Sequence, residues 1–374
     1  MKTIGILGLG SMGKIIAKDL AKTYNGKIIY LAREINSVKS LAKKYNAEIR
    51  YADVSKPKTL VKAFNGIDVL IHAVHHEFNL DVMEACLSSK TNYIDLGGLY
   101  HYTKKQLKLN NQFQKANLTA IIGMGASPGI TNVLAKYASK FLDKIENIEI
   151  KIGYKDFSTY NQISPLSASY SIQTILEEFS WKPAIFVNGK IKFVEPISGR
   201  EEYNFPEPIG MQKPQYTIHS EIATLPYTLK AKNVSFKIAF DDDFVDKIKM
   251  LKENGFISDE KIKINNNEFN IKEVSAEILK KLPKTIPEKI NQCEIIRVIV
   301  SSENKKIIMD AKISGETIDK DTGVPPSIIA QMIVDGKIKD KGVFPPESVI
   351  LGEYFFKELA KRRIYIYKNN KRIN

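Results

Sequence analysis

The chain of 374 residues has little cysteine and contains no apolar run of the length that crosses a membrane. Its two cysteines, Cys86 and Cys293, cannot form the disulfide framework of a small secreted domain, so we expect a protein of the reducing cytoplasm. An apolar strand pattern follows the first residues directly, and we therefore expect no signal peptide and no membrane partner.

Clustered basic residues are also scarce, although the net charge is +14, from 56 Lys and Arg against 42 Asp and Glu. The excess is spread along the chain as single lysines, and the densest cluster is the short segment 361–363. No basic stripe interleaved with aromatics and no zinc or helix-turn-helix spacing accompanies it, so we expect no nucleic-acid partner. A diffuse positive charge instead favours solubility and attracts anionic substrates and cofactors. The length suits two domains.

What the sequence does contain is a glycine-rich loop at its start. The apolar residues 4–7 run into Gly8, Gly10 and Gly13, and a helical pattern follows. The first glycine permits the tight turn, the second lets the backbone approach a pyrophosphate, and the third lets the helix pack on the strand. The N–H groups and the dipole at the start of the helix favour phosphate. The loop therefore predicts a dinucleotide-binding domain rather than a plain tight turn.

The end of the second strand indicates which dinucleotide is bound. Residues 27–31 form an apolar strand, and Arg33 follows it, twenty residues after Gly13. Enzymes that prefer NAD usually place Asp or Glu here to accept from the ribose 2′-OH. A guanidinium cannot accept that hydrogen bond but can clamp a 2′-phosphate, so we favour NADP(H) over NAD(H). The alternative is that Arg33 is a solvated loop residue and Glu34 meets the ribose.

Short apolar strands alternate with helical stretches over the first 126 residues. We expect further strands over residues 49–53, 68–74, 93–96 and 119–124, with helices near 55–65, 79–90 and 103–117. This alternation is typical of an α/β fold with a doubly wound, parallel Rossmann sheet.

Ligands of such a sheet bind in the crevice at the carboxyl ends of the strands. The residues that we expect around this crevice, and hence around the cofactor, are Ser11, Met12, Arg33, Asp53, Val74, His75, His76 and the loop 95–100. For Asp53 two interpretations stay open. Its carboxylate points at the adenine edge, or it caps the helix that begins near Ser55.

The pattern changes after residue 126. Alternating apolar and polar residues predict strands over 148–154, 184–187, 190–194, 233–240 and 294–301. The Asn188-Gly189 pair predicts a tight hairpin between the second and third of these. We therefore expect an α+β domain with a largely antiparallel sheet. The tail returns to helix, turn and a strand near 364–367.

Several segments, in their order and spacing, resemble the saccharopine dehydrogenase family over nearly the whole chain. Besides the glycine loop, they are 92–98, 125–132, 322–327 and 342–347. Around Asp95–Gly98 and Ser127–Asn132 the chain is most similar to lysine 6-dehydrogenase. At Ala32-Arg33 it is similar to the NADP-dependent, glutamate-forming saccharopine reductases, which typically carry Asp where this chain has Ser127.

The resemblance implies a Rossmann domain over residues 1–126 and an inserted substrate and dimerisation domain over 127–325. Residues 326–374 are then C-terminal elements that pack back on the first domain. It also implies a homodimer and hydride transfer between nicotinamide and the C–N bond of a small amino-acid substrate, saccharopine-like or lysine. One alternative is lysine 6-dehydrogenase proper, and a second is a non-catalytic NADP(H)-binding sensor.

Such a reaction needs a base, because only a neutral amine can lose hydride from its carbon. The candidates for proton transfer are Asp95, Tyr100, His101, His219 and Glu221. Asp95 ends a strand at the crevice, and Gly97-Gly98 lets the backbone pass close to a ligand. We favour Asp95, Tyr100 and His219 as catalytic residues, although an isolated histidine is more often a packed or surface residue.

The substrate carboxylate calls for a bidentate clamp, and Arg200 is our candidate. It can equally be a surface arginine. Ser127 and Glu221 are further substrate-binding candidates. Ser127 and Pro128 also fit the N-cap and first position of the helix over 130–141, whose free N–H groups can hold a carboxylate or the nicotinamide amide.

His75, His76 and Glu77 stand together, yet we expect no metal site. Adjacent residues on one loop rarely contact one ion together, and the sequence has no second cluster of Cys or His.

Overall fold

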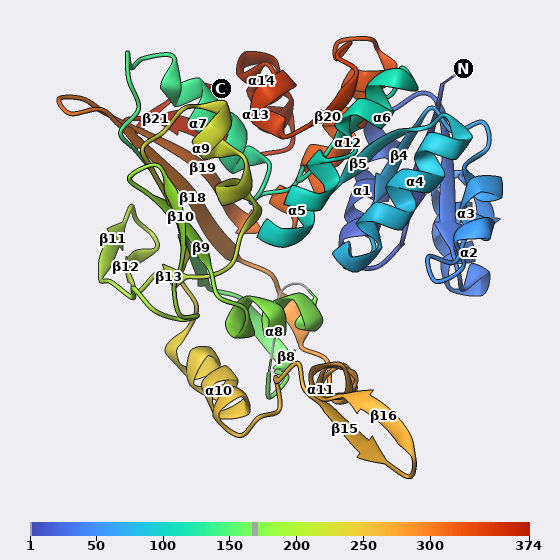
Figure 1. Cartoon of the computed structure of the whole chain (residues 1–374), viewed down its shortest axis with the longest axis horizontal. Helices are drawn as coiled ribbons and strands as arrows, with labels where there is room; N and C mark the ends of the chain where they lie inside the picture. Colours follow the sequence, from blue (N-terminus) through green and yellow to red (C-terminus); the bar gives the residue numbers. More distant parts are fainter. Residues whose placement is uncertain (1, 167–170) are drawn as a thin grey trace.

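The computed structural model describes residues 2–166 and 171–374, which form two α/β units side by side (Figure 1). The first unit is built on a seven-stranded parallel sheet in the order β20-β6-β5-β4-β1-β2-β3. Its strands are β1 (Thr3–Leu7), β2 (Lys27–Ala32), β3 (Glu48–Tyr51), β4 (Val69–His72), β5 (Asn92–Asp95), β6 (Thr119–Ile121) and β20 (Gly342–Phe344). This is the predicted Rossmann-like sheet, and its strand order reverses between β1 and β4, where such sheets bind ligands.

Helices cover both faces of this sheet. They are α1 (Ser11–Thr23), α2 (Ile35–Tyr45), α3 (Pro57–Phe64), η1 (His76–Phe78), α4 (Asn79–Ser89), α5 (Leu99–Leu107) and α6 (Asn110–Lys115). The helical stretch expected near 103–117 is present as two helices, α5 and α6, because the helix is interrupted at residues 108–109. The Asn110 side chain accepts from the amide of Val343 in β20 at 2.9 Å, so a strand far along the chain sets the position of α6.

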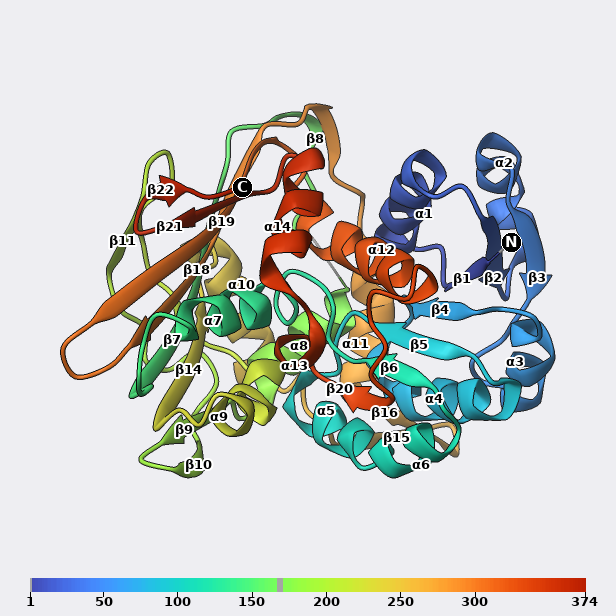
Figure 2. The ribbon, with the colours of Figure 1, turned by 90° about the horizontal axis from the view of Figure 1, so that it is seen from above.

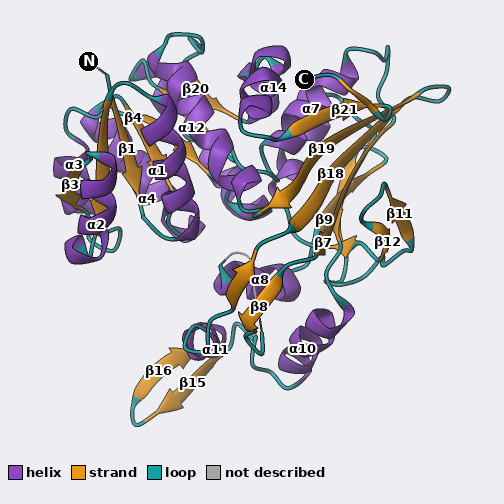
Figure 3. Cartoon of the chain, turned by 180° about the vertical axis from the view of Figure 1, so that it is seen from behind, coloured by secondary structure: helices purple, strands orange, loops and turns teal. Residues whose placement is uncertain are grey.

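The second unit is built on a nine-stranded mixed sheet that is mostly antiparallel (Figure 3). Only β7 and β14 pair in parallel. Its strands are β7 (Asn147–Asp156), β9 (Ala184–Val187), β10 (Lys190–Phe193), β13 (Gln215–Tyr216), β14 (Asn233–Ile238), β18 (Gln292–Ser301), β19 (Lys306–Glu316), β21 (Tyr365–Lys368) and β22 (Lys371–Arg372). The predicted tight turn joins β9 to β10, with positive φ at Asn188 and Gly189.

Helices and three two-stranded sheets complete the second unit. The helices are α7 (Ile130–Ser139), α8 (Ile172–Ser180), η2 (Ser220–Ala223), α9 (Leu225–Thr228), α10 (Asp242–Glu253) and α11 (Ile271–Leu279). The paired short strands are β8 (Thr159–Gln162) with β17 (Ile286–Lys289), β11 (Tyr203–Phe205) with β12 (Gly210–Gln212), and β15 (Lys261–Ile264) with β16 (Asn267–Asn270). The β15–β16 hairpin projects from the body as an arm (Figure 1).

The C-terminal chain belongs to both units. After β19, helix α12 (Lys320–Val334) packs on α1, and β20 extends the first sheet beside β6. The chain then forms α13 (Pro346–Val349) and α14 (Gly352–Lys361), and β21 extends the second sheet beside β19 (Figure 2). Asp19 of α1 ties these parts together. It accepts from Arg362 at 2.8 Å and from the Ser327 hydroxyl, and all three residues are buried.

Among the described residues, no helix combines the length and the hydrophobicity that crossing a membrane requires.

Candidate active site

The glycine loop at the carboxyl end of β1 has the geometry of a phosphate-binding loop. Gly8 has a φ of +91°, and a Cβ there would lie 2.6 Å from Val74 and 2.9 Å from the carbonyl oxygen of Ala73. A Cβ on Gly13 would lie 1.9 Å from the carbonyl oxygen of Gly8. A Cβ on Gly10 would meet nothing within 4 Å, so this glycine leaves open space above the start of α1.

The start of α1 itself suits an anion. Gly10 is its N-cap, no side chain caps its first N–H groups, and its first turn holds no acidic residue. Ser11 and Met12 lie in that first turn. Free N–H groups at a helix start bind phosphate, and the loop therefore fits a dinucleotide pyrophosphate.

Arg33 and Asp53, the two charged candidates for contacts with the adenosine part of the cofactor, differ in exposure and in hydrogen bonding. The Arg33 side chain is 68% exposed after β2 and has only a loose ion pair with Glu34, at 3.8 Å. Asp53 is buried, and its carboxylate accepts from the amide and the hydroxyl of Ser55 at 3.1 and 2.7 Å. It therefore stabilises the turn before α3, whose own N-cap is Lys56.

Asp95 is buried at the end of β5 and has four hydrogen-bond donors around its carboxylate. They are the hydroxyl of Tyr93, the side-chain amide of Gln106 and the backbone amides of Gly97 and Gly123. Burial raises the pKa of Asp95, while these donors act in the opposite direction. The carboxylate thus fastens the ends of β5 and β6 to α5.

A second buried carboxylate, Glu221 in η2, lies where the units meet. Its Oε2 is 2.7 Å from Nδ1 of His219, and its Oε1 accepts from the hydroxyl of Thr131 at 2.7 Å and from the hydroxyl of Ser127. The His219 ring stacks on Phe236 of β14, with centroids 3.8 Å apart and planes at 16°. Because η2 packs against α5, this pair stands at the boundary with the first unit.

The electrostatics of this pair favour a charged imidazole. Burial, the largest single effect, would lower the pKa of His219, but the charge of Glu221, the hydrogen bond to Glu221 and the charge of Glu178 together raise that pKa. Burial would raise the pKa of Glu221, yet His219 and the two hydroxyl donors lower it. A histidine held in this way can give or take a proton near neutral pH.

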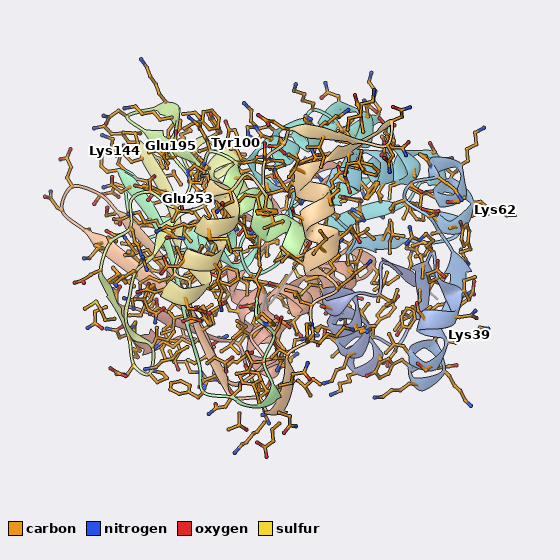
Figure 4. The ribbon with its side chains drawn as sticks, turned by 90° about the horizontal axis from the view of Figure 1, so that it is seen from below. Lys39, Lys62, Tyr100, Lys144, Glu195 and Glu253 are labelled. Atoms are coloured by element: carbon orange, nitrogen blue, oxygen red, sulfur yellow. The ribbon has the colours of Figure 1, made fainter. Side chains whose placement is uncertain are left out.

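The remaining candidates lie in different places. Tyr100 is buried in α5 and packs edge-on against Phe193 of β10, where the units meet (Figure 4). Arg200 pairs instead with Asp242 at the start of α10. Within residues 2–166 and 171–374, no hydrogen bond or ion pair joins Arg200 to Ser127, His219 or Glu221.

The helix-start interpretation of Ser127 is wrong. The N-cap of α7 is Gly129, with a φ of +128°, and the side chain of Asn132 accepts from its amide at 3.0 Å. The Ser127 hydroxyl instead donates a hydrogen bond to the carboxylate of Glu221 in η2.

The loop after β4 brings two histidines to a helix of the second unit. His75 Nε2 and His76 Nε2 lie 3.5 and 3.1 Å from Oε2 of Glu177 in α8. His75 also accepts from the amide of Glu77, with a contact of 3.5 Å. We refer to the contact of η1 and α5 with α8 and η2 as the seam.

Three residues of the site were not predicted. Thr131 lies in the segment 125–132, which resembles the family, but the sequence pattern assigns it no role. Glu177 and Glu178 had a visible signal, since two adjacent acids interrupt the apolar run 175–179 and both are buried. Buried acids almost always have a partner, which is the physical reason to look for one.

Comparison with known proteins identifies both units. Residues 4–121 match the family model described as the saccharopine dehydrogenase NADP binding domain, and residues 125–364 match that of the saccharopine dehydrogenase C-terminal domain. Carboxynorspermidine synthase of Vibrio alginolyticus is 24% identical over 92% of this chain and 91% of its own. Carboxyaminopropylagmatine dehydrogenase of Synechocystis sp. is 24% identical over 93% of both chains.

The fold comparison agrees over the full length. Apo saccharopine dehydrogenase (L-Glu forming) from Saccharomyces cerevisiae superposes with a TM-score of 0.73, covering 100% of both chains at 16% identity. The NADP-binding domain, the C-terminal domain and their order along the chain are thus those of known dehydrogenases. The chain belongs to the saccharopine dehydrogenase family of NAD(P)-binding oxidoreductases.

Proposed function

We propose that the protein is an NADP(H)-dependent oxidoreductase that acts at the C–N bond of an amino acid, with His219 as the proton-transfer residue. The observation that carries the proposal is the buried His219–Glu221 pair at the seam, fastened by Ser127 and Thr131. A histidine with only a packing role, or one at the surface, would not need a buried carboxylate that two hydroxyl groups hold in place.

NADP(H), when bound, supplies or accepts the hydride. In the oxidative direction, His219 takes a proton from the substrate nitrogen, so that the carbon can lose hydride and a C=N bond forms. In the reductive direction, the imidazolium returns that proton to the nitrogen. Glu221 is 0% exposed and its oxygens face only protein groups, so we assign it to positioning His219 rather than to the substrate. Because His219 and Glu221 are buried at the seam, bulk water is kept from competing for the transferred proton.

The substrate class follows from the relatives and from the charge of the site. The names of the two bacterial relatives denote amines that carry a carboxyl group. Such a substrate has a cationic and an anionic end, and the buried carboxylate of Glu178 beside the seam favours the cationic end. Saccharopine, lysine and carboxylated polyamines all meet this description.

Turnover assays test the proposal and separate its alternatives. NADPH absorbance is followed with lysine, saccharopine or carboxynorspermidine plus NADP⁺, and in reverse with the corresponding amine and carbonyl pairs. A rate with lysine alone identifies lysine 6-dehydrogenase proper. Tight NADPH binding without turnover of any substrate defeats the enzyme proposal and leaves the sensor.

Arg33→Ala is expected to remove the preference for NADPH. Each charge-assisted hydrogen bond to the 2′-phosphate contributes about 1.5–3 kcal/mol, so the Kd for NADPH should rise roughly 10–100-fold while that for NADH changes little. The measurement is fluorescence titration of both cofactors. Lys39→Ala, an exposed lysine on α2 of the same unit (Figure 4), is the matched control. Equal loss for both cofactors contradicts a role for Arg33 at the phosphate.

We also propose a homodimer that uses the β15–β16 arm. Ile262, Ile264 and Phe269 of this hairpin are 39%, 49% and 39% exposed, and Ile262 lies opposite Phe269. A two-stranded hairpin with an apolar face is marginal alone, and a second copy of this chain would cover it. The double variant Ile264→Asp/Phe269→Asp should run as a monomer in sedimentation analysis, whereas Lys263→Asp should not. A monomeric wild-type protein refutes the proposal.

A further inference from the structure

At the seam, polar atoms of the partly buried His75 and of the buried His76 and Glu177 converge, and both histidines contact the same carboxylate oxygen. His76 and Glu177 are each 6% exposed, and the His75 side chain is 13% exposed. Nε2 of both histidines and Oε2 of Glu177 are buried and have no hydrogen-bond partner among the described residues. The distances to Oε2, 3.5 and 3.1 Å, are short enough for hydrogen bonds. Each contact joins a histidine ring nitrogen to the same carboxylate oxygen of Glu177.

The two spacings between a histidine nitrogen and the Glu177 carboxylate match the coordination shell of a small divalent ion. With metal–ligand distances of about 2.0–2.1 Å, two ligands of a tetrahedral zinc lie about 3.3 Å apart. The two observed distances bracket that value, and all the potential ligand atoms lie within 4.8 Å of one another. Two imidazoles and one carboxylate are a donor set that zinc accepts, and three protein ligands leave a fourth position open.

The surroundings supply the outer partner that metal-binding histidines have. Nδ1 of His75 faces both the backbone amide of Glu77, at 3.5 Å, and a carboxylate oxygen of Glu77, at 3.4 Å. In the tautomer with the proton on Nδ1, the ring donates to that carboxylate, which orients the ring and leaves Nε2 as the ligand atom. The His76 ring is held edge-on by Tyr102, with centroids 4.9 Å apart. The rings are therefore fixed before any ion arrives.

We propose that His75, His76 and Glu177 form a binding site for a divalent ion of the zinc type that joins the two units across the seam. This departs from the expectation of no metal, which rested on the adjacency of His75, His76 and Glu77 and on the lack of a second cluster of Cys or His. The third ligand comes from α8, a hundred residues after the histidines. The proposal does not depend on the reaction that the protein performs, since His219 and Glu221 contribute no ligand.

Metal binding to the full-length, metal-stripped protein tests this site without any substrate. We expect Co²⁺ to bind one equivalent with the visible absorption of a four-coordinate nitrogen and oxygen site, Zn²⁺ to displace it, and Zn²⁺ to raise the Tm. Glu177→Gln and His76→Gln should weaken binding by more than about tenfold, the loss that even an outer partner causes. His101→Gln, which removes an exposed histidine outside the cluster, should bind as the wild type does.

Two results would overturn the proposal. One is the absence of Co²⁺ absorption and of a Zn²⁺-dependent Tm shift in the wild-type protein. The other is unchanged affinity in folded Glu177→Gln and His76→Gln, which would place the ion elsewhere. If Glu177→Gln does not fold, as judged by circular dichroism, Glu77→Gln provides the second measurement, with an expected loss of about 10–100-fold.

Discussion

Gly10→Ala is expected to abolish useful NADPH binding while the protein stays folded. The backbone of Gly10 has a φ of −71°, which alanine adopts freely, and the new Cβ meets no protein atom within 4 Å. That open space is where a pyrophosphate would reach the N–H groups of α1. The alanine methyl group would push the pyrophosphate away from these N–H groups. Each hydrogen bond to a charged phosphate oxygen contributes about 1.5–3 kcal/mol, so losing two of them raises the Kd for NADPH roughly 100-fold or more.

The measurement combines a fluorescence titration with NADPH and a thermal melt. The Tm should stay within a few degrees of the wild type, since surface changes without a packing clash cost little stability. Gly13→Ala is the contrasting variant. Its Cβ would lie 1.9 Å from the carbonyl oxygen of Gly8, so we expect a loss of about 1–3 kcal/mol in stability from overpacking. Wild-type affinity in Gly10→Ala would show that the phosphate binds elsewhere.

His219→Gln should lower kcat by roughly 10²–10⁴-fold, the usual contribution of a proton-transfer residue. Glutamine keeps a polar group beside Glu221 but cannot exchange a proton near neutral pH. The KM for NADPH should change little, because His219 lies in the second unit, outside the glycine loop. If kcat and the pH profile stay at wild-type values, another group transfers the proton.

Glu221→Gln gives a pH test of the same pair. The Glu221 charge raises the pKa of His219 above its ordinary value of 6.5. The reductive rate, which needs the imidazolium, should therefore fall as the pH rises through this raised pKa, and the oxidative rate should rise. Without the charge, burial lowers the pKa of His219, so both profiles should shift to lower pH. If Glu221 has only a structural role, Glu221→Gln should lower the stability of the protein and leave both pH–rate profiles unchanged.

The glycine loop and the strand pattern of the first unit could be predicted because their causes are local. A run such as residues 4–7 needs burial on both faces, and Gly8 needs a positive φ, whatever follows in the chain. The β9–β10 turn has the same local cause in Asn188 and Gly189. Sequence periodicity records such requirements directly.

The features that sequence analysis missed arise from contacts between distant segments. Ser127 looks like a helix cap until Glu221 is placed beside it, and the position of α6 depends on Val343. In the same way, the partner of His76 is Glu177, which belongs to the other unit. No spacing rule links such residues, because tertiary packing decides which polar groups are left to pair.

The shared C-terminal chain has a consequence for how the protein is synthesised. Strand β20 pairs with β6 in the N-terminal sheet, yet it lies at residues 342–344. Until the ribosome has released those residues, β6 presents an open edge, the kind of surface that pairs with other chains. The unit that is translated first is therefore completed only near the end of translation, and its β6 edge stays open to aggregation while most of the second unit is being synthesised.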